Sequence, residues 1–591
     1  MRRKLVYSIV LVVVLLGVLG VSFNVHEVEA SGTIYIKADG SVEGTTYIVS
    51  DDNVTYTFTA DITDTIVVQR SNITIDGNGR TLQGPGGEGF NLAMMNNVTI
   101  RNTNIKGFGV GIQIIFGSHH NTISGNNITT NGFIGIQVGL WDMDDPTNNN
   151  IISRNNITAN DYYDIYIGPS TSHNTISGNN ITEPREGLDP IPCGIFLGEN
   201  SGNNIISGNN IIGLCLKGIW SEGSSYNTIS GNTITNNVIW GSPYDPYNTL
   251  DGIYLVSSSY NTISGNNITA NHYGIWISPG SHYNTISGNN VTNNVYGILS
   301  NPYEISGGPS NNNIISGNNI TRNRYGIMLR DYSSNNTISG NNITRNSWYG
   351  IDLYTGSNNS FVGNTITKNS YGIRIGESSD NKFYHNNFID KFEGPFGYAN
   401  SWDNGIEGNY WSDYTGVDLN RDGIGDMNHT INANNVDMYP LMGPFHSFNT
   451  SLGKYVNVIS NSTIDSFRYF ESNSTIIMHV SNMTTNQTYG FCRIRIPHAL
   501  INETYHVTID GAEPDYVNYT LHDDEDNRWI YFSYQHSTLE IVIIPEFPSF
   551  LILPLFMVAT LLAVIAHRKK HPKMIARKKK RGVGLNPSRS L

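Results

Sequence analysis

One nine-residue motif constrains this chain more than any other feature. Asn-Thr-Ile-Ser-Gly-Asn-Asn-Ile-Thr occupies residues 121–129 and 174–182, and variants of it begin at residues 150, 204, 227, 261, 284, 313, 336, 359 and 381. Six of the ten steps between successive copies are 22 to 24 residues long. Self-similarity at such a period indicates a stack of repeats rather than a set of ordinary globular domains.

Each repeat predicts three short strands. The Asn-Thr-Ile-Ser and Asn-Ile-Thr segments are followed by a Gly-Ile-x-Ile segment, as at residues 274–277, and turns rich in Asn, Gly and Ser separate them. One coil cannot bury its own row of Ile, whereas coils stacked at about 4.8 Å form continuous Ile columns. We therefore expect an all-β chain whose residues 101–390 form a right-handed parallel β-helix, with three strands per coil and Asn side-chain amides paired from coil to coil.

The rest of the chain divides around this array. Residues 1–30 predict a secretory signal peptide, 31–100 an N-terminal cap with the first coils, and 391–443 a C-terminal cap. Short alternating runs predict a small β-sandwich over 444–545, which would serve as a stalk. Residues 546–567 predict one transmembrane helix, and 568–591 a basic cytoplasmic tail.

Charge separates the tail from the rest. The chain carries −13 in total; because residues 568–591 carry +10 and residues 1–30 carry +1, residues 31–567 carry −24. Such an acidic part repels nucleic acid. The basic tail suits anionic lipid headgroups at a membrane.

The x position of Gly-Ile-x-Ile predicts an aromatic stripe. Strand alternation turns x away from the Ile columns, and five successive coils place an aromatic residue there. Exposed rings at the coil spacing would suit stacking on a polysaccharide; the alternative is a self-stacked ladder covered by other parts of the chain. The predicted ligand-binding residues are Tyr166, Phe196, Trp220, Tyr254 and Trp276.

Two long insertions beside this stripe carry carboxylates. Loops on a rigid scaffold often carry function, and paired carboxylates serve acid–base chemistry or hold Ca²⁺. Solvated acidic loops are the alternative, and no residue is assigned as acid, base or nucleophile. The candidates are Glu183, Glu186, Asp189, Asp245 and Asp251.

A calcium-binding pattern follows the repeats. Oxygen ligands recur at alternating positions of the loop 418–426, Gly423 permits a sharp turn, and a backbone carbonyl would come from Ile424. His429 stands where an EF-hand has its bidentate Glu, so Asp413 or Asp437 would have to complete the shell. We expect a structural Ca²⁺ held by Asp418, Asn420, Asp422, Ile424 and Asp426.

Residues 34–443 resemble the NosD-type and pectate-lyase-like β-helix families. The resemblance lies in the repeated motif, in residues 384–389, and in the closing segment 408–416 with its acidic loop. It implies carbohydrate binding or sugar hydrolysis, and through NosD a role in copper loading, although no copper cluster is evident. The Pro-Glu-Phe-Pro at 545–548 resembles an archaeal surface-sorting signal.

These features favour a protein anchored on an archaeal cell surface that binds carbohydrate or acts as an adhesin. A first alternative is an extracellular polysaccharide lyase, hydrolase or epimerase. The others are a structural envelope protein and a copper-related accessory protein.

Overall fold

The computed structural model describes residues 32–141, 145–183, 193–213, 216–235, 250–300, 308–394, 398–501, 504–546, 560–563 and 565. The chain divides into two compact units, one of Met1–Tyr414 with Asn428–Met438 and one of Thr415–Met427 with Tyr439–Leu591. No helix within the described residues is long and apolar enough to cross a membrane. The predicted signal peptide, Glu186, Asp189, Asp245 and most of the predicted transmembrane span lie outside the described residues.

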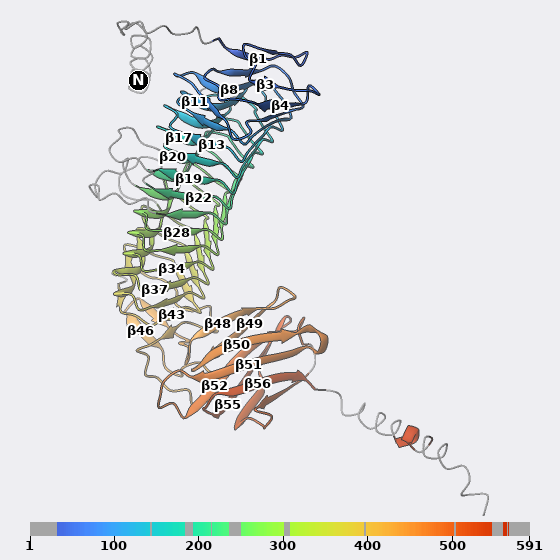
Figure 1. The fold of residues 1–591 in the computed structure, drawn as a ribbon. Coiled ribbons are helices and arrows are strands. Elements are labelled where there is room, and N and C mark those ends of the chain that lie inside the picture. The colour runs from blue at the N-terminus through green and yellow to red at the C-terminus, as the bar shows by residue number, and fades with distance from the viewer. Residues whose placement is uncertain are drawn as a thin grey trace, which may run out of the picture. The chain divides into compact units, whose positions relative to one another are not determined.

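The first unit is the predicted stack of coils, in which each coil gives one strand to each of three sheets (Figure 1). Within the three sheets the pairing is parallel apart from β1 with β2 and β3 with β4. Sheet A, which holds the Gly-Ile-x-Ile segments, runs in the order β2 (Val42–Glu43), β1 (Ile34–Ile36), β5 (Ile66–Val68), β8 (Glu88–Ala93), β11 (Val110–Ile115), β14 (Ile134–Val138), β17 (Tyr163–Ile167), β20 (Cys193–Leu197), β23 (Lys217–Glu222), β26 (Asp251–Val256), β29 (Tyr273–Ile277), β32 (Tyr296–Ser300), β35 (Tyr325–Leu329), β38 (Tyr349–Tyr354), β41 (Tyr371–Gly376) and β44 (Phe392–Glu393).

Sheets B and C hold the other two segments of each repeat. Sheet B, with Asn-Thr-Ile-Ser, runs β3 (Ile48–Val49), β4 (Thr55–Phe58), β6 (Ile73–Asp76), β9 (Val98–Arg101), β12 (Thr122–Ser124), β15 (Ile151–Ser153), β18 (Thr175–Ser177), β21 (Ile205–Ser207), β24 (Thr228–Ser230), β27 (Thr262–Ser264), β30 (Thr285–Ser287), β33 (Ile314–Ser316), β36 (Thr337–Ser339), β39 (Ser360–Val362) and β42 (Lys382–Tyr384). Sheet C, with Asn-Ile-Thr, runs β45 (Tyr410–Trp411), β43 (Asn387–Phe388), β40 (Thr365–Thr367), β37 (Asn342–Thr344), β34 (Asn319–Thr321), β31 (Asn290–Thr292), β28 (Asn267–Thr269), β25 (Thr233–Thr235), β22 (Asn210–Gly213), β19 (Asn180–Glu183), β16 (Asn156–Thr158), β13 (Asn127–Thr129), β10 (Asn104–Lys106) and β7 (Thr81–Gln83). A hairpin of β46 (His429–Asn432) and β47 (Asn435–Asp437) follows.

Three features let the coils stack. Ile columns from all three sheets form one buried core. Buried Asn side chains stack as predicted: the Asn266 amide Nδ2 donates to the Asn289 Oδ1 at 2.9 Å and to the Ile229 carbonyl at 2.9 Å. Gly precedes Ile in sheet A because the coils approach closely there; a Cβ on Gly274 would lie 2.5 Å from the Gly297 carbonyl oxygen.

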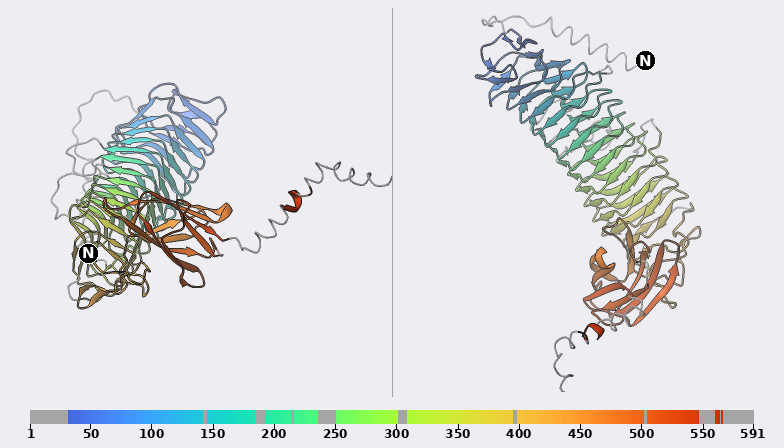
Figure 2. Two further views of the ribbon diagram at one scale, coloured as in Figure 1. Left: turned by 90° about the horizontal axis from the view of Figure 1, so that it is seen from below. Right: turned by 90° about the vertical axis from the view of Figure 1, so that its right-hand side faces the viewer.

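The turns follow one rule, which decides where side chains are exposed. In most coils a residue with positive φ precedes each buried Asn, as do Tyr283 before Asn284 (φ 56°), Gly288 before Asn289 (φ 63°) and Asn293 before Asn294 (φ 57°). A non-Gly residue pays roughly 1–2 kcal/mol for this left-handed conformation. Side chains there stand at the corners of the coils. Figure 2 shows the ribbon of the stacked coils from two further sides.

The second unit is the predicted β-sandwich, with both sheets contributing to one core. One sheet runs β48 (Phe445–Asn449), β49 (Tyr455–Ser460), β52 (Tyr489–Pro497), β55 (Asn527–Gln535) and β54 (Tyr516–Asp523). The other runs β50 (Ser462–Phe470), β51 (Thr475–Asn482), β56 (Leu539–Pro545) and β53 (Tyr505–Ile509), and a short 3-10 helix, η1 (Glu471–Asn473), joins β50 to β51.

Candidate functional site

The outer side of sheet A carries the predicted aromatic stripe, but the stripe is not exposed. Tyr166 and Trp276 are 2% and 0% exposed, Phe196 is buried, and Trp220 and Tyr254 are partly buried. The rings pack on one another, with centroids of Tyr166 and Phe196 5.3 Å apart and those of Tyr254 and Trp276 4.3 Å apart. The expectation of an exposed stripe is therefore wrong, because these side chains bury one another in small apolar clusters outside the main core.

A second column on the same face explains this burial. The residue two positions before each Ile of the Gly-Ile segment is in register from coil to coil and packs beside the stripe. Trp141 also lies against Tyr166, with ring centroids 4.2 Å apart. The members of the second column are Tyr163, Cys193, Lys217, Asp251, Tyr273 and Tyr296.

The second column contains a buried ion pair. The Lys217 Nζ lies 2.5 Å from the Asp251 Oδ2, and the two side chains are 6% and 0% exposed. The same ammonium lies 4.9 Å from the Tyr254 ring centroid. Burial, and then the charge of Lys217, lower the pKa of His272, while burial raises the pKa of Tyr273.

Most of the acidic candidates have side chains outside the described residues. Asp251 is the partner of Lys217 rather than a solvated loop carboxylate, since it lies within β26. Glu183 ends β19, and its side chain lies outside the described part of the chain. Asp251 is the one candidate whose side chain lies within the described part of the chain.

A second charged group lies farther along sheet A. The Asp352 carboxylate accepts a hydrogen bond from the Arg330 Nη2 at 2.7 Å and lies 3.1 Å from the Arg374 Nε. Burial disfavours the charged form of Arg374, yet the Asp352 carboxylate raises the pKa of Arg374 above its ordinary value. These interactions join three successive coils and leave the carboxylate fully buried.

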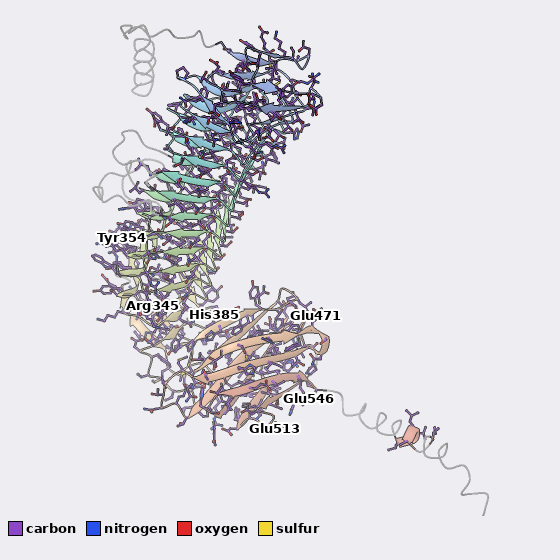
Figure 3. All side chains as sticks on the ribbon, viewed as in Figure 1. Arg345, Tyr354, His385, Glu471, Glu513 and Glu546 are labelled. Atoms are coloured by element: carbon purple, nitrogen blue, oxygen red, sulfur yellow. The ribbon has the colours of Figure 1, made fainter. Side chains whose placement is uncertain are left out.

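Exposed aromatic and basic side chains line the corner between sheets C and A in the same coils. We call this group the aromatic–basic band; Arg345, one of its members, is labelled in Figure 3. The Arg324 guanidinium lies 4.9 Å from the Trp348 ring centroid, and Trp348 and Tyr371 are 39% and 38% exposed. The band consists of Arg322, Arg324, Tyr325, Arg345, Trp348, Lys368 and Tyr371.

Three basic members of the band occupy the same position in successive coils. The Arg322 N–H donates to the Thr344 carbonyl and the Arg345 N–H to the Thr367 carbonyl, so Arg322, Arg345 and Lys368 occupy consecutive rungs. All three have left-handed φ values, of 58°, 56° and 60°. Among the described residues no carboxylate pairs with any of them.

The sequence contained this signal. Basic residues recur as Thr-Arg-Asn at residues 321–323 and 344–346 and as Thr-Lys-Asn at 367–369, each shortly before a Tyr or Trp-Tyr. The x position of Gly-Ile-x-Ile did not point to these residues, because strand alternation gives the face of a side chain and not its exposure.

The acidic loop 418–426 folds around its own backbone and lies in the second unit. The Asp418 carboxylate accepts the N–H groups of Asp422 and Gly423, both at 2.9 Å, and Gly423 has φ +83°. The Asp426 Oδ2 accepts the Leu419 N–H at 2.6 Å. Burial, aided by the charge of Asp422, raises the pKa of Asp418.

Among the described residues, no three His, Cys, Asp or Glu side chains are grouped so as to hold a metal ion, and this includes the three aspartates of the loop 418–426. The described residues therefore do not fit a copper centre. Asp437, a possible calcium ligand, instead accepts the Asn409 N–H and the Trp411 indole N–H, both at 2.8 Å.

Comparison with known proteins agrees with the coil architecture. A family model described as "Right handed beta helix region" matches residues 34–191, and one described as "Periplasmic copper-binding protein (NosD)" matches residues 193–305 and 300–416. This chain is a right-handed β-helix protein. No curated protein matches it.

Solved structures similar to this β-helix protein share little sequence with it. The Dettilon tailspike protein is 15% identical, covering 81% of this chain and 87% of its own, with a TM-score of 0.28. A double mutant of the periplasmic alginate epimerase AlgG is 14% identical, covering 63% and 82%, with a TM-score of 0.31. The A-module of the Azotobacter vinelandii mannuronan C-5 epimerase AlgE6 is 14% identical, covering 63% and 90%, with a TM-score of 0.31.

Proposed function

We propose that this protein binds a linear anionic polysaccharide along the aromatic–basic band. The observation that carries the proposal is the column of Arg322, Arg345 and Lys368 beside the partly exposed rings of Trp348 and Tyr371. Cations would meet the anionic groups of the polymer, and the rings would pack on the apolar faces of its sugars.

The charge distribution supports an anionic ligand. Residues 319–376 contain six Arg or Lys and two Asp, a net charge of +4, whereas residues 31–567 as a whole carry −24. Like charges on neighbouring strands destabilise a sheet. A basic column without carboxylate partners therefore costs stability in the free protein, and a bound polyanion would remove that cost.

The setting is an extracellular one. We propose that residues 1–30 direct secretion and that residues 546–567 anchor the protein, with the coils outside the membrane and the tail of residues 568–591 inside. The segment 545–548 would then act as an archaeal sorting signal. Protease treatment of intact cells would test this orientation, because coils that lie outside the membrane should be digested.

The decisive experiment measures retention of the full-length protein on immobilised polyuronate and on a neutral glucan. The variant Arg322→Asn/Arg345→Asn/Lys368→Asn keeps the turn geometry, because Asn293 holds the same position with φ 57°. Bacterial expression avoids glycosylation of the new asparagines. We expect the variant to lose about tenfold in affinity for polyuronate, from three exposed ion pairs of up to about 1 kcal/mol each.

Arg154→Gly is the matched control. Arg154 is an exposed arginine with φ 56° at a corner where other coils have Gly, so its replacement also removes one cation from a turn. Unchanged binding of the triple variant would refute the proposal, as would equal binding of polyuronate and DNA. New reducing or unsaturated ends on the polysaccharide would reveal an enzyme and direct mutagenesis to Asp251. No retention on any glycan would favour a structural envelope protein.

Calcium remains a separate proposal for the second unit. The loop 418–426 has the oxygen-rich composition and the glycine turn that a Ca²⁺ site needs, and the closeness of Asp422 disfavours the charged form of Asp418 in the absence of a cation. We propose that Ca²⁺ binds there through Asp418, Asn420, Asp422, the Ile424 carbonyl and Asp426 in a structural role, which requires the three carboxylates to come closer together than they lie here.

A further inference from the structure

A second exposed aromatic feature lies at the corner between sheets A and B. Tyr226, Tyr260 and Tyr283 occupy successive coils and form what we call the tyrosine column. Their rings stack with centroid separations of 5.0 and 4.9 Å and interplanar angles of 5° and 6°. They are 58%, 46% and 49% exposed, so this column, unlike the stripe on sheet A, is open to solvent.

The tyrosines occupy a position that other coils fill differently. Each has a positive φ, of 64°, 58° and 56°, just before a buried Asn. Elsewhere the position is held by small or polar residues that adopt this conformation more readily, among them Asn203, Asn312 and Asn335. Three successive bulky residues in an unfavourable conformation are not needed to build the turn, since Asn builds it in the neighbouring coils.

The surroundings of the column are mainly polar. Residues 252–303, which include Tyr260 and Tyr283, contain no Asp, Glu, Lys or Arg, whereas the exposed Glu199 lies against Gly223 in the coil before Tyr226. Within the described chain none of the three phenol hydroxyls has a hydrogen-bond partner. Thr228, Thr262 and Thr285 lie in register in sheet B, two residues after each tyrosine, and add a second row of partly exposed hydroxyls. Around Tyr260 and Tyr283 the surface therefore offers hydroxyl groups and aromatic edges but no charge.

The spacing of the column selects an extended polymer. Because the rings cover one another's faces, they present their hydroxyl-bearing edges outward, one every 5 Å along the axis of the coils. An extended chain of equatorially linked sugars advances by nearly the same distance for each sugar, whereas an axially linked chain curves away from a straight column. Tyr also supplies amphipathic contact area at low conformational cost.

We propose that the tyrosine column is a second binding site, which takes a neutral, linear, equatorially linked glycan running parallel to the coil axis. Each phenol hydroxyl would exchange a hydrogen bond with one sugar, and the threonine row would meet hydroxyls along one side of the polymer. The site is independent of the aromatic–basic band, because it lies at another corner of the coils and carries no charge.

The test uses the full-length protein from a bacterial host and two probes that differ only in linkage. Titration calorimetry would compare cellohexaose, which is β-1,4-linked and extended, with maltohexaose, which is α-1,4-linked and curved. We expect binding of cellohexaose alone and a loss of at least about tenfold in Tyr260→Asn, which removes the central ring of the stack. Tyr260→Phe should retain part of the affinity because it keeps the stack and loses one hydroxyl.

Tyr332→Ala is the matched control, because Tyr332 is 71% exposed and lies outside the column. Melting temperatures of all variants would confirm that they fold. Equal affinity for the two hexaoses, no binding of either, or full affinity in Tyr260→Asn would overturn the proposal. The basic triple variant separates the two sites: it should bind cellohexaose normally, and loss of binding there would show one shared site instead.

Discussion

The stripe on sheet A and the columns at its two corners contain similar residues at the same rung spacing, yet their environments are opposite. Trp276 in β29 is fully buried. Tyr260, which follows the neighbouring strand β26, is 46% exposed. The Lys217 ammonium is enclosed with a carboxylate, whereas Arg345 stands at a corner without one among the described residues. Facing away from the main core therefore does not place a side chain in solvent.

The difference comes from what flanks each column. A residue in the middle of sheet A has a second column beside it and can pack sideways, so large rings bury one another. A residue at a corner precedes a buried Asn in a turn whose backbone curves away, which leaves its side chain free on one side. Corner positions are therefore the better places to seek ligand contacts in this chain.

Truncation of a ring should distinguish the two environments most strongly. Trp276→Ala should destabilise the coils by about 3–5 kcal/mol, since it empties a fully buried site. Tyr260→Asn should cost less than about 1 kcal/mol, because Asn relieves turn strain while losing ring stacking. Calorimetric melting of the first unit would measure both; similar losses would show that the tyrosine column is part of the core.

Charge provides a second test of the comparison. Asp251→Ala should cost about 3–5 kcal/mol because it leaves the Lys217 ammonium buried without its carboxylate. The double variant Lys217→Met/Asp251→Leu should recover most of this loss. Arg345→Asn should stay within about 0.5 kcal/mol of the parent protein. If the double variant does not recover the lost stability, packing rather than charge determines the stability of this site.

Adjacent asparagines sharpen the comparison further. Asn289 is buried and donates through its Nδ2 to the Ile263 carbonyl, whereas the Asn290 Nδ2 donates to the Asn267 Oδ1 on the outer side of sheet C. Asn289→Ala should cost about 2 kcal/mol or more, because buried backbone groups lose their partners. Asn290→Ala should change the unfolding midpoint little, and an equal effect would contradict a special role for the buried ladder.

The smallest expected effect concerns the loop 418–426. Chelation of Ca²⁺ should lower the melting temperature of the second unit by a few degrees, because a bound ion stabilises only the folded loop. The variant Asp422→Asn should melt at the same temperature with and without chelator. A parent protein that is insensitive to chelation would exclude a structural ion at this loop.

The repeated sequence predicted most of the architecture. The alternation of Ile with polar residues, the three segments per repeat and the paired Asn positions predicted three parallel sheets with stacked amides, and all are present. The sandwich was also recognisable from its short alternating runs, because a strand with one buried face needs that pattern.

Only the tertiary structure decided which outward-facing residues are exposed. Exposure depends on the neighbours that other coils place beside a side chain, as the packing of Tyr273 against Trp276 shows. The same holds for Asp251, which the chain alone presents as a loop carboxylate until β23 and β26 bring Lys217 beside it. Sequence periodicity determined the strands and their order, while lateral packing between distant segments determined which of their side chains a ligand can reach.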